Sequence, residues 1–403
     1  FAPEQGQPLV AGDGTTPRAA IEPLTVKMSA PQDYTPLSTL LPRSWAPSFA
    51  YDTTGVTRLG LRLGGVDITR RLSAGLAFGW DVGLGELSAL ASLGIGYGLL
   101  DFDLTLGRYA HDVEAHYDDQ PQPYRQEVFH ARIGMHYGIP HPIVATTLSL
   151  DFSVEVFRGL RHAEITHSPD ELTPIIPREG GTSAFRLAWS FDTSRRDVWS
   201  ISKNRGGEGS LSLRFRLPGF GAEGANFDLT YRLRRYLTMP WHEEHVLCLG
   251  LQGGFSGGSS EEVETFDVGG VPRQDIVSAL MSRAHAGPVW LRGFVPSAFA
   301  ASAYHLASVE YRFPLFRLRR GLDTLPVFAR DLSAALFSDG AWTLLEGDAW
   351  DLRPEDIHVG IGAELRLTTD LLFGFKAHFR LGYAYGFGPG GVHHVYFLLA
   401  PDP

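Results

Sequence analysis

The most regular stretch of this chain is Leu371-Leu-Phe-Gly-Phe-Lys-Ala-His-Phe-Arg-Leu-Gly-Tyr-Ala-Tyr-Gly386. Its odd-numbered positions are mostly large and apolar, whereas its even-numbered positions include Lys376, His378 and Arg380 among small residues. Successive side chains of a β-strand point to opposite faces of a sheet, so this alternation predicts a strand. One face of the strand is apolar, and the other is polar and partly charged.

The same alternation recurs along the chain from Ser44 onward. It is clear at residues 148–156, 185–192, 211–217, 227–234 and 359–368. Weaker versions occur at residues 59–64, 72–81, 89–97, 102–109, 129–137, 246–255, 304–313, 327–339 and 394–400. With a short strand at residues 45–51, these make about sixteen strands, within the range of closed outer-membrane barrels. Most approach the roughly 9–11 residues with which a tilted strand crosses a bilayer.

Two fold classes fit such alternation, a transmembrane barrel and a soluble β-sandwich. In a sandwich the apolar face is the buried core. Here the polar face carries charges of both signs among glycines, which suits a filled lumen. Aromatic residues near predicted strand ends suit an interfacial girdle, namely Trp80, Tyr97, Tyr137, Trp241 and Tyr385. We therefore predict an all-β fold, a single transmembrane antiparallel β-barrel of about sixteen strands.

The predicted connections alternate between short turns and longer loops. Residues 65–70 and 138–142 make short turns, whereas residues 158–181 and 256–301 make long loops. Outer-membrane barrels show this asymmetry, with short periplasmic turns and longer external loops. The connection at residues 193–207 is an exception, because its place in the alternation makes it periplasmic.

Composition argues against several classes of function. The chain has 403 residues and a formal net charge of −10, and this acidic balance argues against a nucleic-acid partner. The single cysteine, Cys248, excludes an intrachain disulfide and a cysteine-rich metal cluster. No apolar run reaches the roughly 18 residues of a transmembrane helix. The chain begins at Phe1 without a visible signal peptide, so we expect a mature or trimmed sequence.

Two parts of the chain differ in pattern. Residues 1–43 are rich in Pro, Gly and Thr and lack periodicity, so we interpret them as a linker or periplasmic strap. Residues 44–403 are expected to form the barrel.

The predicted loop at about residues 256–301 shows no strand pattern and contains Gly287-Pro-Val-Trp-Leu-Arg-Gly-Phe-Val-Pro-Ser-Ala-Phe299. Loops of this length are usually functional or disordered. Trp290 and Phe294 are aromatic residues of the kind that is usually buried, and they surround a lone Arg292 and Gly293. We therefore expect this external loop to fold back into the barrel lumen.

Four elements of the sequence resemble the BamA-like superfamily, also called the bacterial surface antigen family. Leu291-Arg292-Gly293-Phe294 resembles the family's loop motif, and Phe266-Asp-Val-Gly269-Gly270 resembles the element that leads into it. Ser308-Val-Glu310-Tyr-Arg-Phe-Pro-Leu315 and Phe337-Ser-Asp339 resemble two later strand motifs. Gly340 follows Asp339 directly, instead of one residue later as in the family. The resemblance implies a sixteen-stranded outer-membrane barrel for assembly or translocation of proteins.

The resemblance implies an electrostatic role for the loop. A loop in the lumen removes Arg292 from water, so its guanidinium needs buried acceptors. Glu310 and Asp339 are the acceptors that the resemblance suggests, and Glu310 has inward parity opposite Tyr311. Either the resulting latch holds the barrel's shape, or Arg292 acts directly in substrate translocation.

The resemblance also implies a weak seam between the first and last strands. Trp45 and Pro47 lie in the first strand, and Val395 and Phe397 lie in the last. Proline removes a donor from the strand ladder, so Pro47 should weaken this pairing. No POTRA repeat is visible before the barrel. The segment at residues 34–47, with Gly65-Val-Asp-Ile68, is similar to barrels that follow a TolB-like β-propeller.

Three functions remain open. The barrel assembles or translocates client polypeptides, or it is a plugged membrane anchor for a periplasmic, surface or fused propeller partner, or it is a small-solute channel. We expect outer-membrane lipid around it, no catalytic residues, no cofactor and no bound metal. The pair His242 and His245 lacks the spacing of a zinc protease. Inward carboxylates are expected to form a neutralised lumen filling with arginines, and they are Asp151, Glu155, Glu310 and Glu364.

Overall fold

The computed structural model describes one unit of the chain, within residues 36–403. The described residues are 40, 42–51, 57–82, 85–117, 120–161, 180–218, 224–258, 266–270, 289–296, 298–323, 325–344, 356–371 and 375–401. Nearly all of the predicted N-terminal linker or strap, residues 1–39 and 41, lies outside them.

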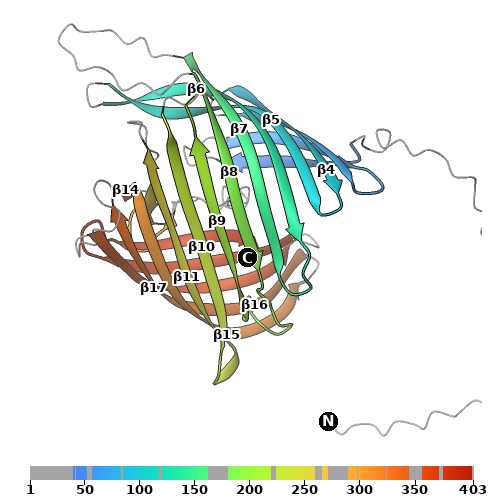
Figure 1. The fold of residues 1–403 in the computed structure, drawn as a ribbon. Coiled ribbons are helices and arrows are strands. Elements are labelled where there is room, and N and C mark those ends of the chain that lie inside the picture. The colour runs from blue at the N-terminus through green and yellow to red at the C-terminus, as the bar shows by residue number, and fades with distance from the viewer. Residues whose placement is uncertain are drawn as a thin grey trace, which may run out of the picture. The chain divides into compact units, whose positions relative to one another are not determined.

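Sixteen strands form one antiparallel sheet (Figure 1). They are β1 (Ser44–Tyr51), β2 (Thr57–Val66), β3 (Leu72–Asp81), β4 (Glu86–Tyr97), β5 (Leu100–Tyr117), β6 (Gln120–Ile139), β7 (Ala145–Arg161), β8 (Gly180–Asp192), β9 (Gly206–Arg216), β10 (Asn226–Met239), β11 (His242–Gly258), β15 (Ala303–Leu322), β16 (Leu325–Leu344), β17 (Ile357–Leu371), β18 (Phe375–Phe387) and β19 (His393–Pro401). Each strand pairs with its neighbours in this order, so the predicted all-β fold with about sixteen strands is confirmed. The described ladders leave β1 and β19 as the two edge strands.

The two faces of the sheet carry opposite chemistry. Leu211, Leu233 and Leu365 are more than two-fifths exposed, and similar large apolar residues occur along nearly every strand. Asp151 and Glu364, by contrast, are at most 5% exposed. This arrangement inverts a soluble sandwich, in which the apolar face is buried, and it fits a barrel with an outer face in lipid and a filled lumen.

No helix among the described residues is long and apolar enough to cross a membrane.

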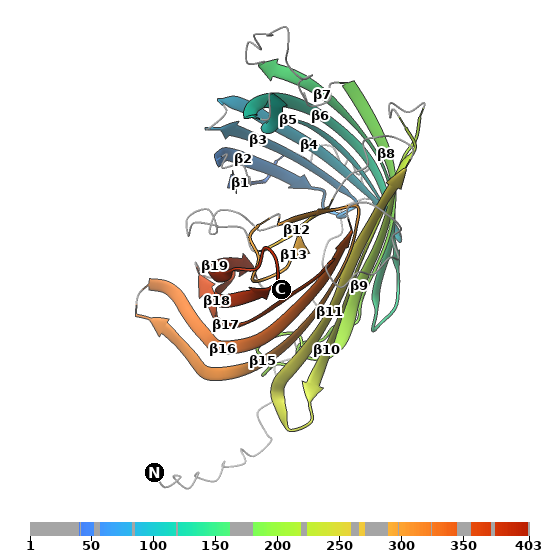
Figure 2. The ribbon, with the colours of Figure 1, turned by 90° about the vertical axis from the view of Figure 1, so that its left-hand side faces the viewer.

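The region from about residue 256 to 301 contains short strands, so the prediction that it is strand-free is wrong. β12 (Phe266–Gly269), β13 (Val289–Trp290) and β14 (Phe299–Ala301) form a separate three-stranded sheet. These strands have only two to four residues, too few for alternation to show. β12 contacts β15 and β14 contacts β16, and Figure 2 shows β12 and β13 on the inner side of the curved main sheet.

The start of the most regular stretch also needs a correction. The sequence pattern predicts one strand from Leu371, but β17 ends at that residue and β18 begins at Phe375. The apolar residues of the pattern run from the end of β17 into the start of β18. Pattern alone therefore does not locate this hairpin.

Candidate functional site

The loop motif at residues 291–294 is fixed by backbone hydrogen bonds on both sides. The Leu291 amide donates to the Gly269 carbonyl at 2.6 Å, and the Gly270 amide donates to the Val295 carbonyl at 2.8 Å. On the other side, the Val392 amide donates to the Gly293 carbonyl at 2.8 Å. The motif is thus tied to its own lead-in strand and to the turn between β18 and β19.

Two glycines of the main sheet allow the loop backbone to approach closely. A Cβ on Gly360 of β17 would lie 1.9 Å from the Arg292 carbonyl oxygen, and one on Gly386 of β18 would lie 2.2 Å from the Gly293 carbonyl oxygen. Gly293 itself has a φ of 96°, a left-handed conformation that favours glycine. Any side chain at these positions would therefore push the loop away from the wall.

The apolar residues of the motif form a small core against the barrel wall. Leu291 and Phe294 are fully buried, and so is Val268 of β12. Phe294 makes an edge-to-face contact with Phe299, with ring centroids 5.6 Å apart. The core cluster contains Val268, Leu291, Phe294, Ala301, Tyr304, Leu306 and Ala341. This core explains why the loop carries aromatic residues that a solvated linker would lack.

The lead-in residues contribute to the same packing. Phe266 lies edge-to-face with Tyr304 of β15, with centroids 5.1 Å apart. A Cβ on Gly270 would lie 1.7 Å from the Phe294 carbonyl oxygen. The structure therefore brings Phe266, Gly269 and Gly270 together with the motif.

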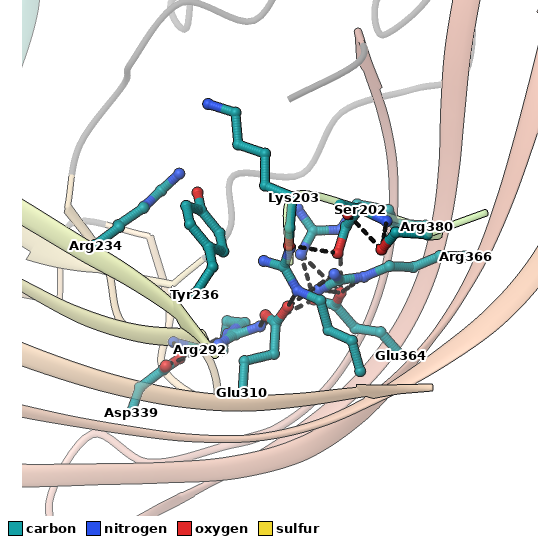
Figure 3. A network of polar contacts seen from close by, with 12 residues as sticks. Ser202, Lys203, Arg234, Tyr236, Arg292, Glu310, Asp339, Glu364, Arg366 and Arg380 are labelled. Atoms are coloured by element: carbon teal, nitrogen blue, oxygen red, sulfur yellow. Dashed lines mark hydrogen bonds and ion pairs between the residues drawn. The ribbon is translucent and has the colours of Figure 1, made fainter. Parts of the chain in front are cut away.

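Arg292 points from the loop into a cluster of buried carboxylates (Figure 3). Its Nε donates to Oδ2 of Asp339 at 2.6 Å, and its Nη2 donates to Oδ1 at 2.8 Å. This two-pronged geometry is the strongest that arginine forms with a carboxylate. The guanidinium carbon also lies 3.5 Å from the ring centroid of Phe337. Asp339 therefore faces inward and is 1% exposed.

Nη1 of Arg292 reaches two further acids. It donates to Oε2 of Glu310 at 3.3 Å and to Oε1 of Glu364 at 3.1 Å. The sequence predicts Glu364 only as part of the lumen filling. The site prediction therefore misses Glu364 as a partner of Arg292. Its inward parity was visible, but its partner lies 72 residues away in the chain.

The carboxylates are shared with arginines of the barrel wall. Glu364 accepts from Arg380 Nη2 at 2.7 Å and from the Tyr396 hydroxyl at 2.6 Å. Arg366 binds both Glu310 and Glu364, at 2.7 and 2.5 Å, and Arg312 binds Glu310. The cluster thus holds four guanidiniums against three carboxylates, a formal charge of +1.

Arg292 keeps its positive charge in this cluster. Burial by itself would lower the pKa of Arg292, but the facing carboxylates of Asp339, Glu310 and Glu364 outweigh it and raise that pKa well above its ordinary value. The loop is therefore held by a guanidinium that keeps its charge beside three buried carboxylates.

The predicted seam residues lie apart from this cluster. Trp45 and Val395 are 73% and 68% exposed, Pro47 is exposed and Phe397 is half-buried. Between Val395 and Phe397, Tyr396 points inward and is 5% exposed. The last strand therefore contacts the Arg292 cluster through Tyr396 and not through the residues that the sequence singled out.

Comparisons with known proteins identify the fold. No family model and no curated protein matches the chain. Among solved structures, BamA from Haemophilus ducreyi lacking POTRA domains 1–3 matches with a TM-score of 0.58 and 11% identity, over 89% of this chain and 69% of that one. CdiB from Escherichia coli matches with a TM-score of 0.50 and 14% identity, over 93% of this chain and 62% of that one.

The class of protein that this fold defines is a sixteen-stranded transmembrane β-barrel with an inward-folded loop. Within that class, the chain has the BamA-like fold, as the loop motif predicted. The chain spans 69% and 62% of the two matched chains.

Proposed function

We propose that this barrel lies in the bacterial outer membrane and takes part in the insertion, assembly or translocation of polypeptides, with the Arg292 loop as a reversible latch. The observation that carries the proposal is the buried guanidinium of Arg292, which joins a loop to acids on β15, β16 and β17. A polypeptide-handling barrel needs a lumen that is closed at rest and that can rearrange. It needs no catalytic residue for that task.

The energetics of the cluster suit a latch. Each charge-assisted hydrogen bond is worth about 1.5–3 kcal/mol. Withdrawing Arg292 leaves Asp339 with no other cation among the contacts of the described residues, although Glu310 and Glu364 keep wall arginines. Loop release therefore carries a large but localised cost, which a client that supplies its own polar groups to the wall would offset.

The loop is also connected to the last strand. Tyr396 of β19 donates to Glu364, which accepts from Arg292. Loop release would remove one partner of Glu364 and change the support of an edge strand. This connection favours a seam that responds to the loop.

A plugged membrane anchor is the second candidate. The observation that favours it is the complete burial of Leu291 and Phe294 together with the multiple ion pairs of Arg292. A loop packed this firmly against the barrel wall suits a rigid membrane anchor for a periplasmic, surface or fused partner.

Outer-membrane proteomics after depletion of the protein in its host separates the two. Assembly predicts a broad loss of other barrel proteins, which the wild-type chain restores and Arg292→Ala does not. The matched control is Arg186→Ala, because Arg186 lies outside the cluster and donates to Ser212. Loss of only one or two proteins would instead support the anchor, and a large stable conductance in planar bilayers would support a small-solute channel.

A further inference from the structure

A row of side chains on β5, β6 and β7 forms a second polar cluster, on strands that share no ladder with the described strands of the Arg292 loop. The register places Asp103, Gly134 and Asp151 directly opposite one another across the three strands. His136 lies two residues beyond Gly134 on the same face of β6, opposite Ser149. Because Gly134 has no side chain, the two carboxylates face each other across an open position.

Three ligand-type atoms converge above this glycine. A Cβ on Gly134 would lie 2.3 Å from Oδ1 of Asp103, 2.7 Å from Oδ1 of Asp151 and 3.0 Å from Nε2 of His136. One ligand atom from each of these three residues lies within 4.8 Å of the other two. The glycine therefore leaves room for three potential ligand atoms to approach a common point.

Asp151 has an unused ligand atom aimed into this space. The residue is 5% exposed, and its Oδ1 has no hydrogen-bond partner among the described residues. Its cross-strand neighbour Arg186 donates instead to Oγ of Ser212 at 2.8 Å. A buried carboxylate oxygen without a donor is unfavourable, so this atom indicates a missing positive partner.

The charges of these residues also indicate a missing cation. Asp103 is balanced by Arg132, whose Nη2 lies 2.7 Å from Oδ2 of Asp103, which leaves Oδ1 facing His136 and Asp151. Asp151 has no ion pair with a described residue. Two carboxylate oxygens and one imidazole nitrogen form a ligand set that suits Zn²⁺ and related divalent ions. We propose that Asp103, His136 and Asp151 bind a divalent first-row transition metal ion, with Zn²⁺ as its representative.

The surrounding residues already provide the outer support that metal ligands need. Nδ1 of His136 lies 3.0 Å from Oγ of Ser149, so it can carry the proton and leave Nε2 free for the metal. Nε2 now contacts Oδ1 of Asp103 at 2.6 Å, and a metal ion replaces this contact by a bond to each atom. The bound ion would cross-link β5, β6 and β7 from the luminal side.

The test uses the untagged full chain in detergent, in a His242→Gln/His245→Gln background. This background is needed because the ring centroids of His242 and His245 lie 4.4 Å apart at the start of β11, so the pair could compete for Zn²⁺. Calorimetric titration with Zn²⁺ should show one equivalent bound, and Co²⁺ should give visible ligand-field absorption. Asp151→Asn should weaken Zn²⁺ binding by at least about tenfold.

A matched control is Asp228→Asn. Asp228 is also a buried luminal carboxylate, 4% exposed, but it lies 3.0 Å from Arg214 Nε and outside the metal cluster. Its substitution should leave Zn²⁺ affinity unchanged. His136→Gln gives a second route to the same loss, and it decides the matter if Asp151→Asn does not fold. The proposal is wrong if the background protein binds no Zn²⁺, or if folded variants at residues 136 and 151 keep its affinity.

Discussion

The hydroxyl of Tyr396 donates to Oε1 of Glu364 at 2.6 Å, and the same oxygen accepts from Nη1 of Arg292 at 3.1 Å. One carboxylate oxygen therefore joins the last strand of the sheet to the inward-folded loop. The two elements are distinct in sequence and share no ladder among the described strands. This polar connection runs through a side chain of β17.

Tyr396→Phe should loosen the last strand without removing a charge. The phenylalanine keeps the packing against Phe337 and Leu398 but loses a hydrogen bond to a carboxylate, worth about 1.5–3 kcal/mol. Hydrogen exchange of β19 amides should accelerate. Tyr383→Phe is the matched control, because Tyr383 of β18 lies on the exposed face and its hydroxyl bonds to Nδ1 of His393 in β19. Equal acceleration of exchange in both variants would show that the hydrogen bond to Glu364 does not specifically stabilise β19.

Arg292→Lys should open the loop although it keeps the positive charge. Lysine offers a point charge and cannot make the two parallel hydrogen bonds to Asp339. Loss of about 1.5–3 kcal/mol corresponds to a roughly 10–100-fold faster exchange of the protected Leu291 amide. The raised pKa of Arg292 means that the wild-type latch keeps its cation up to strongly alkaline pH. Wild-type exchange in the lysine variant would show that charge alone holds the loop.

Gly360→Ala should displace the loop by sterics alone. Its Cβ would lie 1.9 Å from the Arg292 carbonyl oxygen, a contact that backbone must move to relieve. Overpacking of this kind costs about 1–3 kcal/mol, so the thermal unfolding midpoint should fall. Gly340→Ala on the adjoining strand is the control, because a Cβ there meets nothing within 4 Å. A midpoint for Gly360→Ala that equals the control would contradict the close approach.

Pro47→Val should tighten the proposed seam. Valine restores a backbone donor to β1 and favours extended structure, which adds about 0.5–1.5 kcal/mol of strand pairing. Fluorophores on cysteines introduced at Trp45 and Val395, in a Cys248→Ser background, would report seam opening with temperature. The opening midpoint should rise in the valine variant. An unchanged midpoint would count against a seam limited by this proline.

The sequence predicted the main sheet because each strand carries its own two-faced pattern. Alternation predicts fifteen of the sixteen strands, and the short strand at residues 45–51 completes the set, because strands of such a barrel carry an apolar outer face and a polar inner face. The sequence pattern does not predict β12, β13 and β14, because strands of two to four residues are too short to show alternation. Their positions depend on packing against β15 and β16, which no local pattern encodes.

The candidate site was predictable only in part. Parity placed Glu310 on the inner face, and the resemblance suggested that it and Asp339 would meet Arg292, which they do in the structure. The parity of Glu364 predicts an inward side chain but does not predict its contact with Arg292. The register between neighbouring strands decides which inward acids lie at the same height in the barrel and so reach the same arginine. The same holds for the proposed metal ligands, whose convergence needs Gly134 directly between Asp103 and Asp151.

The order of the cluster's members along the chain has a kinetic consequence. Arg292 precedes Glu310, Asp339 and Glu364 by 18, 47 and 72 residues, so its socket is complete only when β15, β16 and β17 have paired. Contacts of such separation form late, because the chain between them must first be ordered. Docking of the loop is therefore a late folding step, and a buried Arg292 reports that the C-terminal third of the sheet has reached its native register.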